Sequence, residues 1–276
     1  MEPIKEFLEN HRNIAKIFPE PRFESESEKP LDKRHLLAKQ FFFDDTFDHK
    51  SISQHLFEHL EENLGFLQEE IQNKKSLPRI LRDPKEYINL IGQIEIAVLF
   101  KKMGFDIELE PAVPGTIKKS DIKIVRGEFT AYIEVRTLHD REGTLISKSE
   151  YVKISTIKNH SLPTIKEIIT KKSQQLSEHH PGILVINLDQ ISRSSHFEGG
   201  FYEISKECPI VSAMLIYRHY FNNEGCRVFI DYFANPYARK PVPETIIRLF
   251  ETGGMRISTW NERDIALVEE MNESTQ

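Results

Sequence analysis

The sequence predicts an α/β protein in which a mixed β-sheet is flanked by helices and follows a helical N-terminal region. Residues 120–137 alternate apolar and polar side chains on both sides of a Gly-Glu pair, the period of a half-buried β-hairpin. Residues 182–188 (GILVINL) form a continuous apolar run, which is typical of a strand covered on both faces. Apolar residues at helical spacing before and after the hairpin predict the flanking helices.

Length and composition indicate a packed protein. The chain has 276 residues, of which 39% are hydrophobic and 29% charged, so a core is available. No apolar run approaches the roughly 20 residues of a membrane span, and the N-terminus is too polar for a signal peptide. The two cysteines, Cys208 and Cys226, have no metal-type spacing and are expected to be buried thiols. We therefore expect a cytoplasmic protein without a membrane partner.

Charge is distributed unevenly along the chain. The net charge of −6 argues against a surface coated with basic groups for nucleic acid. Residues 111–175, however, carry 12 Lys+Arg and 7 Asp+Glu, a local net charge of +5. This basic segment holds the hairpin and is compatible with phosphate binding there. A solvated lysine-rich surface explains the charge equally well.

Residues 1–82 are predicted to form a mainly helical N-terminal region. Residues 51–73 place apolar side chains at helical spacing, as in one long amphipathic helix. The polar stretch 21–30, with a proline at each end, is interpreted as a loop or linker. The three phenylalanines at 41–43 are expected to be buried. Nothing here suggests chemistry, so the region is interpreted as a helical cover or as a homodimer contact.

A buried helix is predicted from Asp83-Pro84 to Gly104, with proline in its first turn and glycine at its end. Glu95 lies inside the apolar run IEIAVLF of this helix. An ionised carboxylate is costly there unless it is paired or binds a metal. A functional role for Glu95 is about as well supported as the alternative, which is a salt bridge to Lys102 or a position at the edge of the apolar stripe.

The hairpin follows a short predicted strand at 106–110. A two-residue turn at Gly127-Glu128 sets a register in which Asp121 faces Glu134 across the two strands. Lys123 and Arg136 share the face of these two acids. Like charges opposite each other are destabilising, so a lysine, an arginine or a bound divalent metal must offset them.

A helix near Pro163 and further strands are predicted after the hairpin. The apolar stripe of this helix also contains Lys172, with Gln175 beside it; the alternative is a snorkelling lysine that covers apolar surface. The remaining stripe residues are Ile165, Ile168, Ile169 and Leu176. Later elements are expected as strands at 182–188, 211–217 and 227–233, a turn at 235–236, and helices at 243–250 and 261–271.

This order of elements and acids resembles the restriction-endonuclease-like superfamily, the PD-(D/E)XK nucleases. Asp121 matches the motif aspartate, and Glu134-Val135-Arg136 lies where Glu-X-Lys is expected. Glu95 is the candidate for the acid that many members carry on the first helix. The resemblance covers about residues 86–190, and the predicted domain spans residues 83–276.

The resemblance implies a metal-dependent nuclease that hydrolyses phosphodiester bonds with Mg²⁺ or Mn²⁺. It implies nucleic acid, with DNA favoured, as the partner. Arg136 stands in place of the motif lysine, and Lys123 or Lys172 is placed to take its role. The alternative is a non-catalytic domain of this fold that binds nucleic acid or protein. The implied site has metal ligands Asp121, Glu134 and the carbonyl of Val135, catalytic residues Arg136, Lys172 and Glu95, and nucleic-acid contacts Lys119, Lys123 and Gln175.

Overall fold

The structure is a computed structural model of the 276-residue chain. It describes the following residues: 2–30, 33–35, 37–38, 41, 50–72, 74, 86–115, 117–138, 162–188, 201–222 and 225–258. The predicted last helix at 261–271, the side chain of Cys226 and the predicted domain boundary at residue 82 lie outside this part of the chain, as do Phe42 and Phe43.

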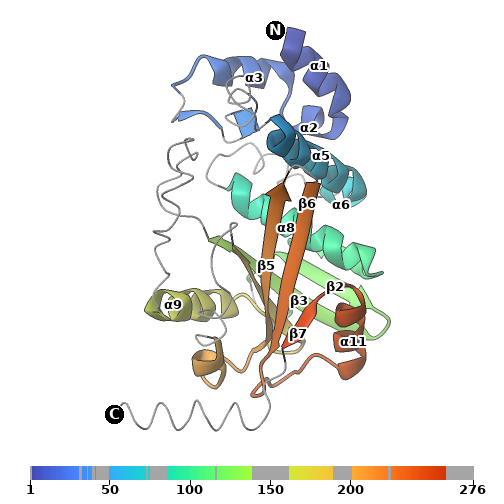
Figure 1. The fold of residues 1–276 in the computed structure, drawn as a ribbon. Coiled ribbons are helices and arrows are strands. Elements are labelled where there is room, and N and C mark those ends of the chain that lie inside the picture. Colours follow the sequence, from blue (N-terminus) through green and yellow to red (C-terminus); the bar gives the residue numbers. More distant parts are fainter. Residues whose placement is uncertain are drawn as a thin grey trace. The chain divides into compact units, whose positions relative to one another are not determined.

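The strands form one seven-stranded mixed sheet with the order β1-β2-β3-β4-β5-β6-β7 (Figure 1). β1 and β2 are antiparallel, β3, β4 and β5 run parallel, and β7 is parallel to β6. A mixed sheet flanked by helices confirms the predicted fold class at this level. The strands are β1 (Asp106–Leu109), β2 (Ile122–Arg126), β3 (Phe129–Leu138), β4 (Gly182–Leu188), β5 (Val211–Asn222), β6 (Gly225–Ala234) and β7 (Arg256–Ser258).

The chain divides into two compact units. The first comprises Met1–Pro111, Asp121–Arg126 and His219–Val228, and the second comprises Ala112–Ser120, Gly127–Arg218 and Phe229–Gln276. The first therefore contains β1 and β2 in addition to the N-terminal helices.

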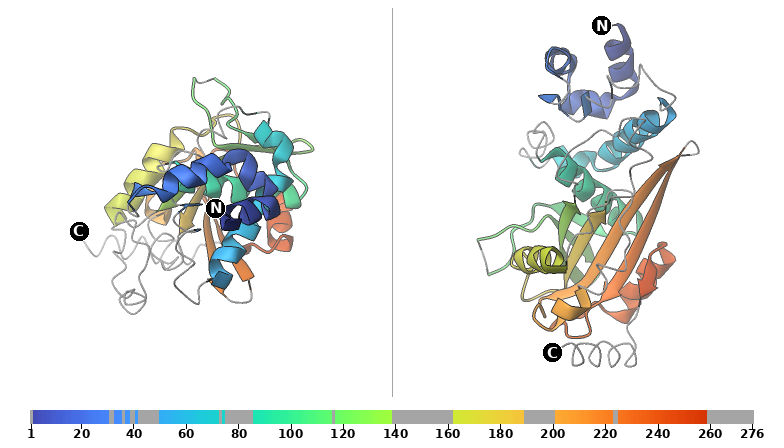
Figure 2. Two further views of the ribbon diagram at one scale, coloured as in Figure 1. Left: turned by 90° about the horizontal axis from the view of Figure 1, so that it is seen from above. Right: turned by 60° about the vertical axis from the view of Figure 1, so that its left-hand side comes forward.

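The first unit is built mainly from helices (Figure 2). The ring of Phe7 lies close to three other phenylalanine rings, those of Phe23, Phe41 and Phe57, with centroids between 4.8 and 5.7 Å away. This aromatic cluster joins helices that are distant in sequence. The helices are α1 (Glu2–Asn10), α2 (Arg12–Ile17), α3 (Glu20–Ser27), α5 (Lys50–Phe66), α6 (Gln68–Gln72) and α8 (Tyr87–Lys102).

Two expectations for the N-terminal region are wrong. The stretch expected as a loop or linker at 21–30 is largely the helix α3, because proline is tolerated in its first turn and Phe23 is fully buried. The single helix expected over 51–73 is interrupted at Leu67, which separates α5 from α6. Leu67 is completely buried, and Gly65, a weak helix former, lies two residues before it.

The buried carboxylate of Glu26 anchors α3. Its Oε1 accepts a hydrogen bond from the Lys29 ammonium at 2.7 Å, and its Oε2 accepts one from the His35 amide at 2.7 Å. Arg22 adds an ion pair at 3.2 Å. Burial alone would raise the pKa of Glu26, but these hydrogen bonds and the two cationic charges outweigh it and lower the pKa below its ordinary value of 4.5.

We expect this lowered pKa to make the first unit sensitive to acid. The stabilisation by Glu26 is present above the pKa of the unfolded chain, near 4.5, and is lost as pH falls through the lower folded pKa. Glu26→Gln should lower the free energy of unfolding at pH 7 by about 2 kcal/mol and flatten its fall between pH 5 and 3. Urea unfolding measured over this pH range tests both, with Glu24→Gln on the same helix as the matched control. Equal pH profiles for Glu26→Gln and wild type would contradict the expectation.

The helix α8 confirms the buried helix that was expected before β1. Ile94, Ile96, Ala97 and Phe100 are fully buried, and Gly104 follows the helix with a φ of 81°, which glycine adopts without strain. The expected start at Asp83-Pro84 lies outside the described residues, whose helix begins at Tyr87.

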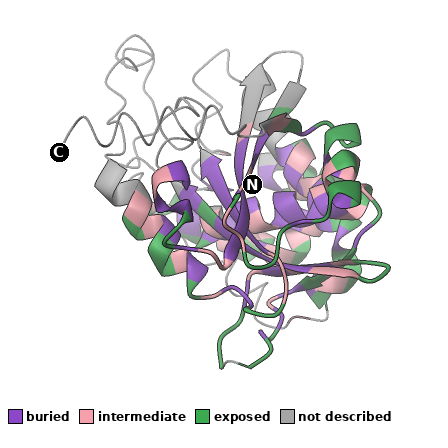
Figure 3. Ribbon diagram, turned by 90° about the horizontal axis from the view of Figure 1, so that it is seen from below, coloured by how far each residue is buried: buried purple, intermediate pink, exposed green. Residues whose placement is uncertain are grey.

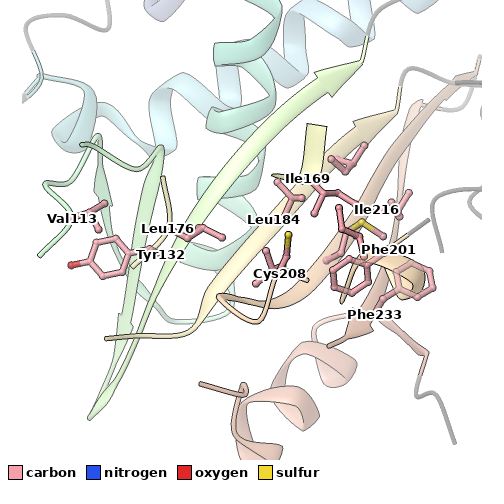
Figure 4. Close-up of a cluster of buried hydrophobic side chains, with 13 residues drawn as sticks. Val113, Tyr132, Ile169, Leu176, Leu184, Phe201, Cys208, Ile216 and Phe233 are labelled. Carbon is pink, nitrogen blue, oxygen red and sulfur yellow. The ribbon is translucent and has the colours of Figure 1, made fainter. Parts of the chain in front are cut away.

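The second unit has a core on the face of the sheet that α9 (Leu162–Ser173) covers (Figure 4). Leu184 and Ile186 of β4 pack there with Ile169 of α9 and with Phe201 from the short helix at 201–205, which the sequence analysis missed. Cys208 lies in the same cluster as a free thiol, as expected, and burial raises its pKa. Figure 3 shows how completely the middle of the sheet is buried.

The helix α11 (Glu244–Thr252) packs against the opposite face of the sheet. Phe250 of α11 contacts Tyr232 of β6, whose side chain points away from that of its neighbour Phe233 in the α9 core. Buried Asn235 ends β6, and its side-chain amide donates to the carbonyl of Val211 at 2.8 Å. The helix and the turn at Asn235-Pro236 are therefore where the sequence predicts them, whereas the three-residue strand β7 was not predicted.

Candidate active site

The best-defined feature of the predicted site is a buried ion pair in the second unit. Glu134 lies in the middle of β3, and its side chain is 0% exposed. The ammonium of Lys172, near the end of α9, lies 2.8 Å from Glu134 Oε2. The side chain of Lys172 is 20% exposed, so it reaches from the edge of the core toward the carboxylate.

The local sequence explains how Lys172 reaches this position. Ile169, three residues earlier, is fully buried, and Leu176, four residues later, is 2% exposed. These neighbours turn the same side of the helical segment toward the sheet, so Lys172 faces it as well. A buried carboxylate and an inward-facing ammonium are each costly alone, and pairing offsets part of both costs. The Lys172 ammonium was predicted to lie near both Asp121 and Glu134, and its approach to Glu134 is confirmed, whereas its approach to Asp121 stays a prediction.

Arg136 is placed differently from Glu134, although both belong to β3. Every residue from Ala131 to Val135 is buried, whereas Arg136 is exposed. Alternation along the strand puts Glu134 and Arg136 on the same face of the sheet. On this face of β3, the side chain of Glu134 is therefore buried, and that of Arg136, two residues later, reaches solvent.

Two further predicted residues lie on or near α9. Gln175 is half-buried just after the helix, and its main-chain amide donates to the carbonyl of Lys172 at 3.0 Å. Lys119 is exposed in the segment that leads into the hairpin. The neighbouring Lys118 ammonium donates to the carbonyl of Gln174 at 2.8 Å and so ties that segment to the end of α9.

Asp121 directly precedes β2 and is half-buried. It belongs to the first unit, whereas Glu134 belongs to the second. Within the second unit, the Ser120 hydroxyl donates to the carbonyl of Ile133 at 2.8 Å, so the residues that immediately precede Asp121 and Glu134 are hydrogen-bonded. The turn at Gly127-Glu128 is also confirmed, with a φ of 59° at Gly127. The register of Asp121 opposite Glu134 stays a prediction.

The main chain is strained beside Asp121. Glu110 has a φ of 47°, in the left-handed region that residues other than glycine seldom adopt. Its amide donates to the carbonyl of Asp121 at 2.9 Å, which holds the two residues together within the first unit. Strain of this kind costs about 1–3 kcal/mol and clusters at functional positions.

Lys123 lies in a cross-strand pair on the first unit. It stands opposite Glu108 of β1 in the antiparallel register, and its ammonium lies 3.4 Å from Glu108 Oε2. Lys74 approaches the other oxygen of Glu108 at 3.8 Å. The Lys123 ammonium therefore has an acidic neighbour on its own unit. The role of Lys123 in binding nucleic acid stays a prediction.

Glu95 is buried on α8, with a side chain that is 5% exposed. Its Oε1 lies 3.5 Å from Nε2 of His59 on α5, a neighbour that the sequence analysis did not foresee. Lys102, the partner considered from the sequence, is exposed, and its ammonium lies 5.8 Å from the centre of the Phe66 ring. Burial and the charge of Glu95 together raise the pKa of Tyr87. No sequence signal pointed to His59, because it lies 36 positions away on another helix.

Within the described ranges, no three His, Cys, Asp or Glu side chains converge as a group that would hold a metal ion. No helix in the same ranges has the length and apolar character needed to cross a bilayer.

Comparisons with protein families, with curated proteins and with solved structures find no match to this chain. The class of protein that the structure defines is therefore a mixed α/β protein with a seven-stranded sheet. The restriction-endonuclease-like arrangement is carried by the sequence resemblance alone.

Proposed function

We propose that this chain is a metal-dependent nuclease of the restriction-endonuclease-like kind, with Glu134 and Lys172 in its active site. The observation that carries the proposal is the ion pair of 2.8 Å between a fully buried strand carboxylate and a helix lysine. This sequence lacks the motif lysine at Arg136, and Lys172 supplies an ammonium to the motif glutamate from another element. Asp121 belongs to the proposed site through the sequence resemblance, as the motif aspartate.

The donor set suits Mg²⁺ or Mn²⁺ in its chemistry. Glu134 offers a buried carboxylate, Asp121 is the second carboxylate in the proposal, and the Val135 carbonyl adds an oxygen. Hard oxygen ligands of this kind are those that these cations prefer. When bound, the cation would polarise the phosphate and lower the pKa of its water. The described part of the chain holds no group of three ionisable ligands, so the proposed set relies on two carboxylates and a main-chain oxygen.

The protein's own residues would divide the remaining work. Lys172 holds a positive charge beside Glu134 and is placed to stabilise the negative charge that develops on a phosphodiester. Arg136, exposed on the same face, can contact a phosphate with two parallel hydrogen bonds but cannot accept a proton. We assign phosphate positioning to Arg136 and charge stabilisation to Lys172.

Cleavage assays test the proposal directly. Purified protein should cut at least one of labelled single-stranded DNA, duplex DNA or RNA in Mg²⁺ or Mn²⁺, and EDTA should stop the reaction. Glu134→Gln and Asp121→Asn should each lower the rate by about 100-fold or more, with circular dichroism spectra unchanged. Absence of cleavage in every combination, or full activity in Glu134→Gln, would refute the nuclease.

A second function is favoured by the ion pair itself. Lys172 neutralises Glu134 through a direct protein contact, which is also how a structural pair would satisfy a buried carboxylate. In that case the domain binds nucleic acid or protein without hydrolysis. A wild-type protein that binds labelled nucleic acid but never cleaves it would favour this function over the first.

A further inference from the structure

A second charged cluster lies on strands β5, β6 and β7 of the second unit. Asp231 of β6 has a side chain that is only 4% exposed, and each of its carboxylate oxygens receives one arginine. Arg218 Nη2 lies 2.5 Å from Oδ2, and Arg256 Nε lies 2.6 Å from Oδ1. We refer to Arg218, Asp231 and Arg256 as the arginine clamp.

The arginine clamp carries more positive charge than Asp231 requires. One arginine would neutralise the buried carboxylate, and the second leaves a surplus charge of +1. Each guanidinium has five N–H donors, and one nitrogen of each lies against Asp231. The side chain of Arg256 is 69% exposed and faces solvent, whereas that of Arg218 is 28% exposed. A guanidinium held in this way suits the oxygens of a phosphate.

An exposed aromatic ring lies beside the arginine clamp. The main-chain amide of Asn235, the residue after β6, donates to the carbonyl of Ser212 on β5 at 3.0 Å, which makes these two residues opposite partners. Continued along the neighbouring strands, which Figure 1 draws side by side, this register puts Phe229 opposite Arg218. The side chain of Phe229 is 53% exposed. Phe233, on the same face four residues later, is 1% exposed in the α9 core.

The arginine clamp shares a sheet face with the proposed active site. Glu134 pairs with Leu184 of β4, which pairs with Met214 of β5, and side chains paired in this way point to the same side. Leu184, Met214 and Phe233 belong to one hydrophobic cluster. Asp231 and Phe229 lie two and four residues before Phe233 on β6, so their side chains point to the same face of the sheet. Arg218 and Asp231 lie two to three strands across the sheet from Glu134, about 10–15 Å, and two to four residues further along the strands, about 7–14 Å, so the separation is about 16 Å. At about 3.4 Å per nucleotide, about five nucleotides span this distance.

We propose that the arginine clamp and Phe229 form a binding surface for single-stranded nucleic acid, in which the two arginines hold a phosphate and the exposed ring stacks on a base. The proposal makes single-stranded nucleic acid the substrate class of the nuclease, and it rests on the proposed nuclease function. Proteins that bind single-stranded nucleic acid combine basic side chains, which contact the phosphates, with exposed aromatic rings, on which the unpaired bases stack. A duplex keeps its bases stacked inside the helix and offers Phe229 no such face.

Binding measured without metal tests the inference separately from catalysis. A fluorescein-labelled 20-nucleotide oligo(dT) and a duplex of equal length are titrated in EDTA and followed by anisotropy. Arg256→Gln should weaken binding of the single strand about fivefold and reduce the slope of log affinity against log salt by about 0.7. Phe229→Ser should weaken it about tenfold without changing that slope. Arg248→Ala, an exposed arginine on α11, is the matched control and should bind as wild type.

The outcomes separate the two proposals. Wild-type affinity for oligo(dT) in both Arg256→Gln and Phe229→Ser would overturn the binding surface, even if the protein cleaves nucleic acid. Tighter binding of the duplex than of the single strand would overturn it as well. Binding that depends on both residues, in a protein that cuts nothing, would keep this surface as a binding site and refute the nuclease. Arg256 and Phe229 are both largely exposed, so neither variant removes core packing.

Discussion

Lys172→Ala should lower the rate of nucleic-acid cleavage by about 100-fold or more, and at least as severely as Arg136→Ala. The Lys172 ammonium lies 2.8 Å from the carboxylate of Glu134, which is fully buried, whereas Arg136 is exposed on the same face of the sheet. Removal of one preorganised charge next to a reacting phosphate costs about 10²–10³ in rate. Single-turnover cleavage at saturating Mg²⁺ measures the chemical step without the contribution of binding.

The neighbouring lysine provides the control for this experiment. Lys171 precedes Lys172 on α9 and is exposed, so Lys171→Ala removes the same charge from the same turn without touching Glu134. We expect Lys171→Ala to cleave within about twofold of wild type. Lys172→Arg should keep part of the activity, because it keeps the charge but not the compact shape of the ammonium. Unchanged turnover in Lys172→Ala, beside an inactive Asp121→Ala, would make Lys172 a snorkelling residue.

Regular periodicity explains which elements were predictable. The hairpin turn, β4 and α11 follow from local patterns of apolar residues, glycine and proline, and the structure confirms each of them. The helix α3 was missed because its sequence is polar and only Phe23 and Glu26 are buried. What stabilises α3 is a set of contacts to Glu26, one of them from the amide of His35 nine positions later. A window along the sequence does not contain that information.

Some residues of the candidate site were also predictable from local sequence patterns, and others were not. Lys172 was predictable because its position in an apolar stripe leaves an ammonium that must find an acid nearby. Glu95 was predictable as a buried carboxylate but not as a neighbour of His59, since the packing of α5 on α8 brings them together. The arginine clamp was missed altogether. Its three members lie 13 and 25 positions apart and meet only because β5, β6 and β7 are neighbours.

The Glu134–Lys172 pair should also appear as a large coupling in stability. Lys172→Met removes the ammonium and leaves the buried carboxylate without it, which should lower the free energy of unfolding by about 3 kcal/mol. Glu134→Gln removes the charge and should cost less. In the double variant neither charge is left, so its loss should be about 2 kcal/mol smaller than the sum of the two single losses, and this difference is the coupling energy. Urea unfolding of the four proteins at pH 7 in EDTA measures this cycle.

Added metal then distinguishes a structural pair from a cation site. If Glu134 can ligate Mg²⁺, the cation should replace the missing ammonium, and 10 mM Mg²⁺ should raise the melting temperature of Lys172→Met more than that of wild type. Glu134→Gln/Lys172→Met should show no such gain, because the carboxylate that would bind the cation is absent. A coupling energy below about 0.5 kcal/mol would mean that the contact contributes no more than an exposed ion pair. A strong coupling with no effect of Mg²⁺ on any variant would identify Glu134 and Lys172 as a structural pair and would count against the nuclease.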